Sequence, residues 1–203
     1  MLVEGNTNID VLRHVDVDNV ELPAIARANA RFVVFSIHRA ETILKKDRMG
    51  QIVALARKVA LSYPILFCLH PPTRRQLERF GYLDELASLE NCTLSDLQPY
   101  PIFIGTLSRA YFIVTDGGSI QEESYYLNIP ALVTREHTER TEGLGTTACL
   151  SGFDARKMQD FLENVERYRS SDYQDTGLHP SQQIVDFILK LHNEPASGQS
   201  LNG

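Results

Sequence analysis

Residues 111–123 read Tyr-Phe-Ile-Val-Thr-Asp-Gly-Gly-Ser-Ile-Gln-Glu-Glu, and this stretch contains the transition that decides the fold. Its first five residues are aromatic or β-branched, as expected for a strand buried on both faces of a sheet. Two glycines follow, and a helix is expected to begin near Ser119. A buried strand that turns directly into a helix is the repeating unit of parallel α/β folds.

The same alternation extends along the chain in both directions. Three more short apolar runs are predicted to be parallel strands, at residues 32–37, 64–69 and 131–134. We expect helices on both faces of the sheet because parallel strands require right-handed crossovers. The predicted helices cover residues 24–30, 48–63, 73–89 (with a break at Gly81), 100–110, 119–127, 155–168 (capped by Asp154) and 181–192.

Length and composition limit the classes of protein. The 203 residues suffice for one sizeable domain but not for two, and the net charge of −6 argues against nonspecific nucleic-acid binding. Three scattered cysteines are typical of reduced thiols rather than of disulfides or a metal site. No apolar run approaches the roughly 20 residues that span a membrane, and no signal peptide is present. We therefore expect a cytoplasmic protein without metal or cofactor.

The chain is expected to consist of three parts. Residues 1–30 are interpreted as a lead-in or interdomain segment, residues 31–192 as the main domain and residues 193–203 as a flexible tail. The sequence Gly5-Asn-Thr-Asn begins the chain abruptly, so we expect the domain to have been cut from something larger.

Polar clusters follow the predicted strands, at the edge where parallel sheets bind ligands. The clusters are His38-Arg-Ala-Glu41, His70, Asp116-Gly-Gly-Ser119 and the charged run from Arg135 to Glu142. Glycines and a helix N-terminus can receive a phosphate, and Glu123 can accept hydrogen bonds from sugar hydroxyls. Each cluster also has a plain structural interpretation: a simple turn, a salt-bridged loop, a solvated charged face or, for His70, a capping histidine. The residues alone leave these alternatives open.

The order of these clusters resembles one known family. Over residues 3–192, the chain resembles the C-terminal half of the bacterial and archaeal UDP-N-acetylglucosamine 2-epimerases. The resemblance implies a Rossmann-like, doubly wound domain, one half of a two-domain fold of the glycosyltransferase-B type, with UDP-sugar between the halves. It rests on the segments Gly5-Asn-Thr, His38-Arg-Ala-Glu41, His70-Pro, Gln98-Pro-Tyr-Pro-Ile-Phe103, Thr115 to Glu123, Pro130-Ala-Leu-Val and Thr138-Glu-Arg-Thr-Glu142.

The resemblance also implies roles for individual residues. His38 matches a histidine important for catalysis, and Arg39 and His70 match residues that contact a second, regulatory UDP-sugar in non-hydrolysing members. The implied ligands of the UDP-sugar itself are Gln98 and Phe103 at the uracil, Gly117, Gly118 and Ser119 at the pyrophosphate, Glu123 at the ribose and Arg140 at the sugar.

Two departures from the family pattern leave the sugar open. The family usually has Asp-Ser-Gly-Gly where this chain has Asp116-Gly-Gly-Ser119, which moves the hydroxyl by two positions. The family's Glu-Arg-Pro-Glu is Glu139-Arg-Thr-Glu142 here, which makes a less rigid loop. Whether the reaction is hydrolysing also stays open.

Family members remove the sugar C2 proton and eliminate UDP, and UDP then returns to give the N-acetylmannosamine epimer. The resemblance therefore implies an isomerase of polysaccharide biosynthesis that acts on UDP-N-acetylglucosamine or a close relative. The family's carboxylate acid/base residues lie in the N-terminal domain, so this chain alone is expected to bind UDP without turnover. A homodimer is one assembly that the resemblance allows. The alternatives are half of a UDP-sugar-dependent glycosyltransferase and a non-catalytic UDP-sugar-binding module.

Overall fold

The computed structural model describes residues 5–17, 19–28, 30–169, 173, 175 and 177–193. They fall into two compact units, one within Val15–Tyr173 and the other containing the described residues before and after that range. The two units meet in the sequence after His14 and after Tyr173, whereas boundaries were expected after residues 30 and 192. The expected tail lies outside the described residues except for its first residue, Asn193.

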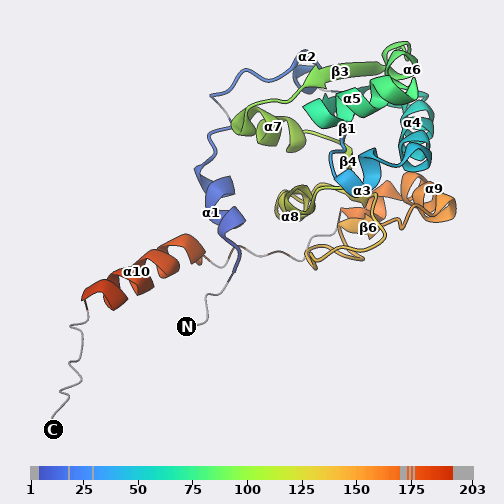
Figure 1. The fold of residues 1–203 in the computed structure, drawn as a ribbon. Helices are drawn as coiled ribbons and strands as arrows, with labels where there is room; N and C mark the ends of the chain where they lie inside the picture. The colour runs from blue at the N-terminus through green and yellow to red at the C-terminus, as the bar shows by residue number, and fades with distance from the viewer. Residues whose placement is uncertain are drawn as a thin grey trace, which may run out of the picture. The chain divides into compact units, whose positions relative to one another are not determined.

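The larger unit is built on a six-stranded sheet in which every neighbouring pair is parallel, in the order β3-β2-β1-β4-β5-β6 (Figure 1). The four predicted strands are confirmed within one residue or two at their ends. Two further strands, β3 and β6, lie at the edges of the sheet and were not predicted. The strands are β1 (Val33–Ser36), β2 (Ile65–Leu69), β3 (Cys92–Asp96), β4 (Phe112–Thr115), β5 (Ala131–Val133) and β6 (Ala148–Leu150).

Helices cover both faces of this sheet, as predicted. One face carries α2 (Ala24–Arg27), α7 (Tyr100–Leu107) and α8 (Gly118–Tyr126). The opposite face carries α3 (Ala40–Ile43), α4 (Lys46–Ala60), α5 (Pro71–Phe80), α6 (Leu83–Ala87) and α9 (Ala155–Glu163), which a 3₁₀ turn at Val165–Tyr168 follows. Figure 1 shows α4, α6 and α9 along one face and α7 and α8 along the other.

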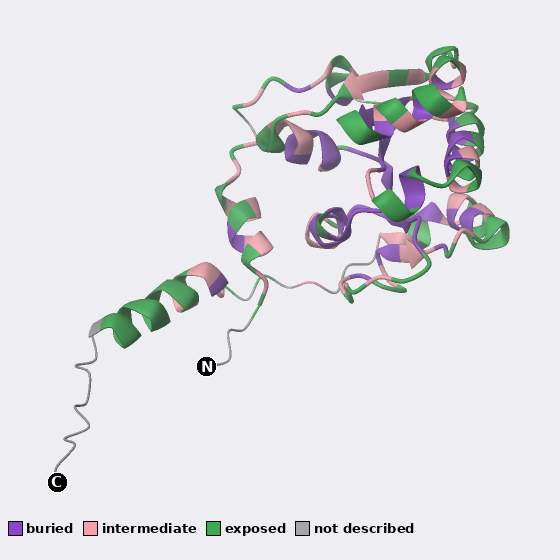
Figure 2. Ribbon diagram, in the orientation of Figure 1, coloured by how far each residue is buried: buried purple, intermediate pink, exposed green. Residues whose placement is uncertain are grey.

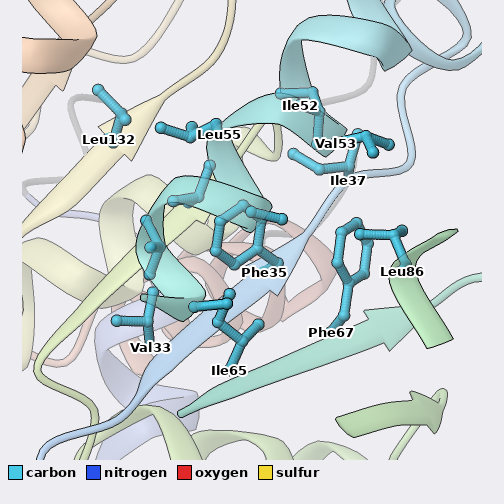
Figure 3. Packing of buried hydrophobic residues seen from close by; sticks show 14 of the residues in the cluster. Val33, Phe35, Ile37, Ile52, Val53, Leu55, Ile65, Phe67, Leu86 and Leu132 are labelled. Atoms are coloured by element: carbon cyan, nitrogen blue, oxygen red, sulfur yellow. The ribbon is translucent and has the colours of Figure 1, made fainter. Parts of the chain in front are cut away.

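Alternate residues of each strand enter two separate cores, because successive side chains of a strand point to opposite faces. Val33 and Phe35 pack under α4, and Val34 packs with the helices of the other face. Figure 3 shows Phe35 and Phe67 facing the side chains of α4 and α6. The rings of these two phenylalanines stack with centroids 5.3 Å apart. All residues of β1 are buried, which explains why its first three residues, Val33 to Phe35, are apolar (Figure 2).

Two local signals act as the sequence predicts. Gly81 adopts a left-handed conformation with φ of 78° and ends α5, so the predicted helix at residues 73–89 is two helices. Asp154 caps α9 because its carboxylate accepts hydrogen bonds from the backbone N–H groups of Arg156 and Lys157.

The smaller unit contains α1 (Thr7–His14) and α10 (Pro180–Asn193). Asp10 joins the two helices because its carboxylate, which is buried, accepts a hydrogen bond of 2.7 Å from the backbone N–H of Ser181. Arg13 forms an ion pair with Asp175 and donates to the carbonyl of Leu178. Among the described residues, no helix has the length and apolar character that crossing a membrane requires.

Candidate functional site

The strand order places β1 beside β4, with Ser36 paired with Thr115 at their carboxyl ends. The chain leaves β1 toward β2 on one side and leaves β4 toward β5 on the other, so a crevice forms between the two departing loops. His38 and Arg39 follow β1 directly, and Asp116 follows β4. The sequence-predicted clusters therefore meet at this crossover point.

Asp116 ties the two loops together. Its fully buried carboxylate accepts hydrogen bonds from the backbone N–H of His38 at 2.9 Å and of Arg39 at 3.0 Å. The Oδ1 atom also lies 3.6 Å from Nδ1 of His38. The carboxylate thus fixes the backbone of the first loop and places negative charge beside the imidazole.

His38 and His70 form a stacked pair of imidazoles. Their ring centroids lie 4.5 Å apart with the planes inclined by 27°. Nε2 of His70 lies 3.4 Å from the hydroxyl of Ser36, which holds the second ring against the end of β1. Burial lowers the pKa of His70, His38 lowers it further, and Asp116 opposes both effects.

The glycines after β4 allow close packing beside these rings. A Cβ atom on Gly117 would lie only 2.9 Å from Cε1 of His38. A Cβ atom on Gly118, the first residue of α8, would lie 3.1 Å from Oε1 of Glu139 and 3.3 Å from Cγ of Arg140. A side chain at either position would therefore displace the side chains that pack against this turn.

A pocket of about 300 Å³ lies between α7, α8 and the carboxyl ends of β1 and β2. It brings together five of the residues predicted for the site, from three separate segments of the chain. Most of its remaining lining is apolar. The lining consists of Ser36, Cys68, His70, Leu97, Gln98, Tyr100, Phe103, Ser119, Ile120 and Glu123.

Glu123 is the carboxylic acid among the residues that line this pocket. Its side chain accepts a hydrogen bond of 2.9 Å from the hydroxyl of Tyr100. Burial raises the pKa of Glu123 to about 7, with a smaller contribution from Glu122, although the hydrogen bond from Tyr100 acts in the opposite direction. The carboxyl group can therefore change its charge near neutral pH.

Gln98 retains an unused acceptor in the same pocket. Its amide nitrogen donates to the hydroxyl of Ser95 at 3.3 Å, while its Oε1 atom is buried and has no hydrogen-bond partner among the described residues. A buried carbonyl oxygen without a donor is costly, so this atom favours a ligand that carries an N–H group.

The charged run after β5 forms an ion-pair network. The carboxylate of Glu139 pairs with the guanidinium groups of Arg39 at 3.0 Å and Arg135 at 2.9 Å. Arg135 also pairs with the carboxylate of Glu41, at 3.2 Å. The pKa of Glu139 is lowered to about 2, mainly because its carboxylate accepts a hydrogen bond from the backbone N–H of the same residue. The positive charges of Arg135 and Arg39 lower this pKa further. Arg140 forms a separate pair of 2.7 Å with buried Glu122.

The structure thus separates the predicted residues into two groups. Gln98, Phe103, Ser119, Glu123 and His70 line one pocket, and His38 adjoins it through its stack with His70. The other predicted residues, Gly117, Gly118, Arg39 and Arg140, form the turn and the ion-pair network beside that pocket. Among the described residues, no group of three potential ligands could hold a metal ion.

Three residues of the site received no role from the sequence. Tyr100 lies within the segment from Gln98 to Phe103, but nothing in its spacing indicates a bond to Glu123. Asp116 could have been noticed as a carboxylate directly after a buried strand, where a structural role for it is common. Glu122 gave no signal, because its partner Arg140 is 18 residues away in the chain.

Comparison with known proteins identifies one family. The family model described as UDP-N-acetylglucosamine 2-epimerase matches residues 1–196. The UDP-N-acetylglucosamine 2-epimerase of Salmonella typhimurium is 32% identical over 174 residues, which are 78% of this chain and 44% of that protein. The protein of the same name from Methanococcus maripaludis is 29% identical over 140 residues, 68% of this chain and 38% of that protein. The chain therefore spans less than half the length of these two relatives.

Solved structures agree with this comparison. The UDP-GlcNAc 2-epimerase of Methanocaldococcus jannaschii, in complex with UDP-GlcNAc and UDP, matches with a TM-score of 0.82 and 25% identity, over 94% of this chain and 54% of that chain. The Neisseria meningitidis enzyme bound to UDP-GlcNAc matches with a TM-score of 0.67 and 26% identity, over 92% of this chain and 54% of that one. An E. coli heptosyltransferase, at 14% identity and a TM-score of 0.54, shares the fold alone over 80% of this chain and 50% of its own.

The expected fold class is confirmed, since the parallel sheet with helices on both faces is one Rossmann-like half of a fold of the glycosyltransferase-B type. The family match covers nearly the whole chain, and two of the solved relatives were captured with the nucleotide-sugar or its nucleotide. This chain belongs to the UDP-N-acetylglucosamine 2-epimerase family.

Proposed function

We propose that the pocket between α7 and α8 binds the UDP part of UDP-N-acetylglucosamine or a close relative, in an enzyme that epimerises the sugar at C2. The observation that carries this proposal is the convergence of Gln98, Phe103, Ser119 and Glu123 on one pocket at the carboxyl edge of the sheet. These side chains match the parts of a uridine nucleotide: an aromatic ring and an amide for uracil, a carboxylate for the ribose, and a hydroxyl at a helix start for the pyrophosphate.

The nucleotide would lie across the pocket in a defined direction. Uracil would pack on Phe103 and donate its imide N–H to the unused oxygen of Gln98. The ribose hydroxyls would donate to Glu123, whose carboxylate already accepts from Tyr100. The pyrophosphate would then reach the start of α8 at Gly118 and Ser119, where N–H groups are free of helical partners.

This direction brings the sugar toward His38 and Arg140. Elimination removes the proton from sugar C2 while the bond between C1 and the pyrophosphate oxygen breaks, which leaves a 2-acetamidoglycal and UDP. Return of the proton on the opposite face and of UDP to C1 completes the epimerisation. The departing pyrophosphate gains negative charge in this step, and the start of α8, Arg140 and His38 are the groups that would stabilise it.

We further propose that catalysis requires a second half of the protein. This chain spans 54% of the M. jannaschii enzyme, and the one carboxylate that lines the described pocket, that of Glu123, is assigned here to the ribose. An independent observation is the apolar surface of α10, which is exposed in this chain (Figure 2). Exposed apolar patches usually contact other protein, so we assign this one to the second half. Its side chains are Ile184, Val185, Phe187, Ile188, Leu189 and Leu191.

Calorimetric titration of the 203-residue chain with UDP, ADP and GDP tests the nucleotide assignment. We expect UDP to bind at least about tenfold more tightly than either purine nucleotide, since only uracil presents an imide N–H to Gln98 in a pocket of this size. Equal affinity for all three would refute the uridine assignment. A Gln98→Leu variant should lose the preference, while Gln51→Leu, on α4 at the opposite face of the sheet, should keep it.

A further inference from the structure

A second pocket, larger than the candidate nucleotide pocket, lies at the edge of the sheet where the strands begin. This pocket of about 640 Å³ lies at the amino-terminal ends of β1, β4 and β5, beside Phe32, Tyr111 and Ile129, which precede those strands. The candidate nucleotide pocket lies at the opposite edge, at the carboxyl ends of β1 and β2. Between Phe32 and Ser36 the chain advances about 13 Å at roughly 3.3 Å per residue, so the two pockets are separate.

Arginine dominates the lining of this pocket. Four arginines and one glutamate surround it, namely Arg27, Arg31, Arg109, Arg169 and Glu166. The lining therefore has an excess of three positive charges, in a chain whose net charge is −6. Such a local excess attracts anions independently of the overall charge.

Two of these arginines are held in place. The ring of Tyr111 lies under both guanidinium groups, 4.6 Å from that of Arg31 and 5.4 Å from that of Arg169. Arg169 also donates a hydrogen bond of 2.7 Å to the backbone carbonyl of Tyr111. Glu166 contacts both arginines, at 3.7 Å and 3.5 Å. Both arginines line the pocket, and a single carboxylate, that of Glu166, lies near the two of them.

The other two arginines lack comparable partners. Arg109 is exposed and makes no ion pair with any described residue. Arg27 reaches only Glu21, at 3.9 Å between largely exposed side chains, a distance at which an ion pair contributes little. The C-terminus of α7 at Leu107 lies near Arg109 in sequence, but a helix end carries only about half a negative charge. One helix end does not balance four arginines.

We propose that this arginine pocket binds a small molecule that carries a phosphate group. Guanidinium groups bind phosphate through paired N–H donors. One carboxylate group has too few acceptor oxygens for four arginines, so the lining favours phosphate over a carboxylate ligand. The volume is within the range of pockets for small organic ligands. The apolar floor formed by Phe32, Ala110 and Ile129 suits the organic part of a phosphate ester better than a bare ion.

Calorimetry on the 203-residue chain at low ionic strength tests the proposal, with inorganic phosphate and glucose 6-phosphate as the probes. We expect saturable binding of a phosphate probe, weakened about tenfold in Arg109→Gln, since one charge-assisted contact is lost. Arg79→Gln, which removes an exposed arginine of α5 at the opposite face, should bind as the wild type does. Tighter binding of glucose 6-phosphate than of phosphate identifies an ester as the ligand, and equal binding identifies the free ion.

The variants also separate this pocket from the nucleotide pocket. Binding of the probes should survive Gly118→Val, and binding of UDP should survive Arg109→Gln. Absence of saturable binding for both probes overturns the proposal, as does an equal loss in Arg109→Gln and Arg79→Gln, which would show a nonspecific charge effect. Loss of phosphate binding in Gly118→Val alone would place the anion at the start of α8 and would also refute the arginine site.

Discussion

The carboxylate of Asp116 accepts the backbone N–H of His38 across 78 residues of sequence, at 2.9 Å. The same carboxylate accepts the next N–H of the chain, that of Arg39, so both oxygens are used by one loop. Since Asp116 is fully buried, water cannot replace these bonds. The position of His38 beside the pocket therefore depends on a residue at the end of a different strand.

Substitution of Asp116 by asparagine should loosen this loop. The amide offers one acceptor where the carboxylate has two, and its NH₂ group would face a backbone donor. We expect the free energy of unfolding to fall by about 1.5–3 kcal/mol and the affinity for UDP to fall with it. Urea denaturation and calorimetry measure the two effects. Asp84→Asn, on the exposed start of α6, is the matched control, and equal stability of both variants would contradict the role given to Asp116.

The start of α8 provides a second prediction. Gly118→Val should weaken UDP binding more than Ser119→Ala, because a side chain at Gly118 meets Glu139 at 3.1 Å and Arg140 at 3.3 Å. The loss of the Ser119 hydroxyl removes one hydrogen bond to the pyrophosphate, which corresponds to roughly tenfold in affinity. Titration with UDP compares these variants with Glu90→Gln, an exposed position in the loop before β3 that should change nothing. Wild-type affinity in folded Gly118→Val would remove this turn from the binding site.

The raised pKa of Glu123 predicts a pH dependence of binding. In the proposed complex the ribose hydroxyls would donate to the ionised carboxylate of Glu123. The free protein protonates this carboxylate as the pH falls below about 7. Affinity for UDP-N-acetylglucosamine should therefore weaken by up to about tenfold per pH unit below that value. The intact nucleotide-sugar is the suitable ligand, since its pyrophosphate diester does not titrate in this range, unlike the terminal phosphate of UDP.

The control for this pH dependence is Glu123→Gln, which should bind more weakly at pH 8 and should lose the decline below pH 7. Protonation of His70 would act in the opposite direction, because a cation favours an anionic ligand. A decline that persists in the glutamine variant would assign the effect to another group.

The same pKa predicts how stability varies with pH. In the unfolded chain Glu123 releases its proton near the ordinary value of 4.5, whereas the folded protein keeps it up to about 7. The free energy of unfolding should therefore decrease as the pH rises from about 4.5 to about 7, by the contribution of this group. Urea denaturation of the wild type and of Glu123→Gln across that range isolates the contribution, and parallel curves for the two proteins would refute it.

The central strands could be predicted because burial on both faces gives each of them a run of consecutive apolar residues. The two edge strands could not. In β3 the sequence Cys92-Thr-Leu-Ser-Asp96 is partly exposed throughout and half polar, so it resembles a loop. In β6 only Ala148, Cys149 and Leu150 are paired, which is too short a run to show a period.

The charged run after β5 shows a different limit of sequence analysis. Its arginines and glutamates suggested ligand contacts, a solvated face or both. In the structure, Arg135 is buried and forms ion pairs with Glu41 and Glu139, and Arg140 is paired with Glu122. Glu139 belongs to the run itself, but Glu41 and Glu122 come from two other segments, so local spacing does not reveal those two partners. The position of this run after a strand indicated the region of the site. It did not show which of its side chains form ion pairs within the protein rather than with a ligand.

The last prediction concerns catalysis by the chain itself. Epimerisation begins with removal of the C2 proton, and the groups near the proposed sugar position are His38 and Arg140, of which Arg140 is always charged and already paired with Glu122. Without a carboxylate from a second half, we expect no exchange of the C2 hydrogen when UDP-N-acetylglucosamine is incubated with the chain in D₂O. Proton NMR follows the C2 signal, the 2-epimer and free UDP in one sample, and saturation transfer in that sample shows that the ligand binds. Deuterium incorporation at C2 that His38→Ala abolishes would show that this half carries the base, and the requirement for a second half would then be wrong although the nucleotide pocket would stand.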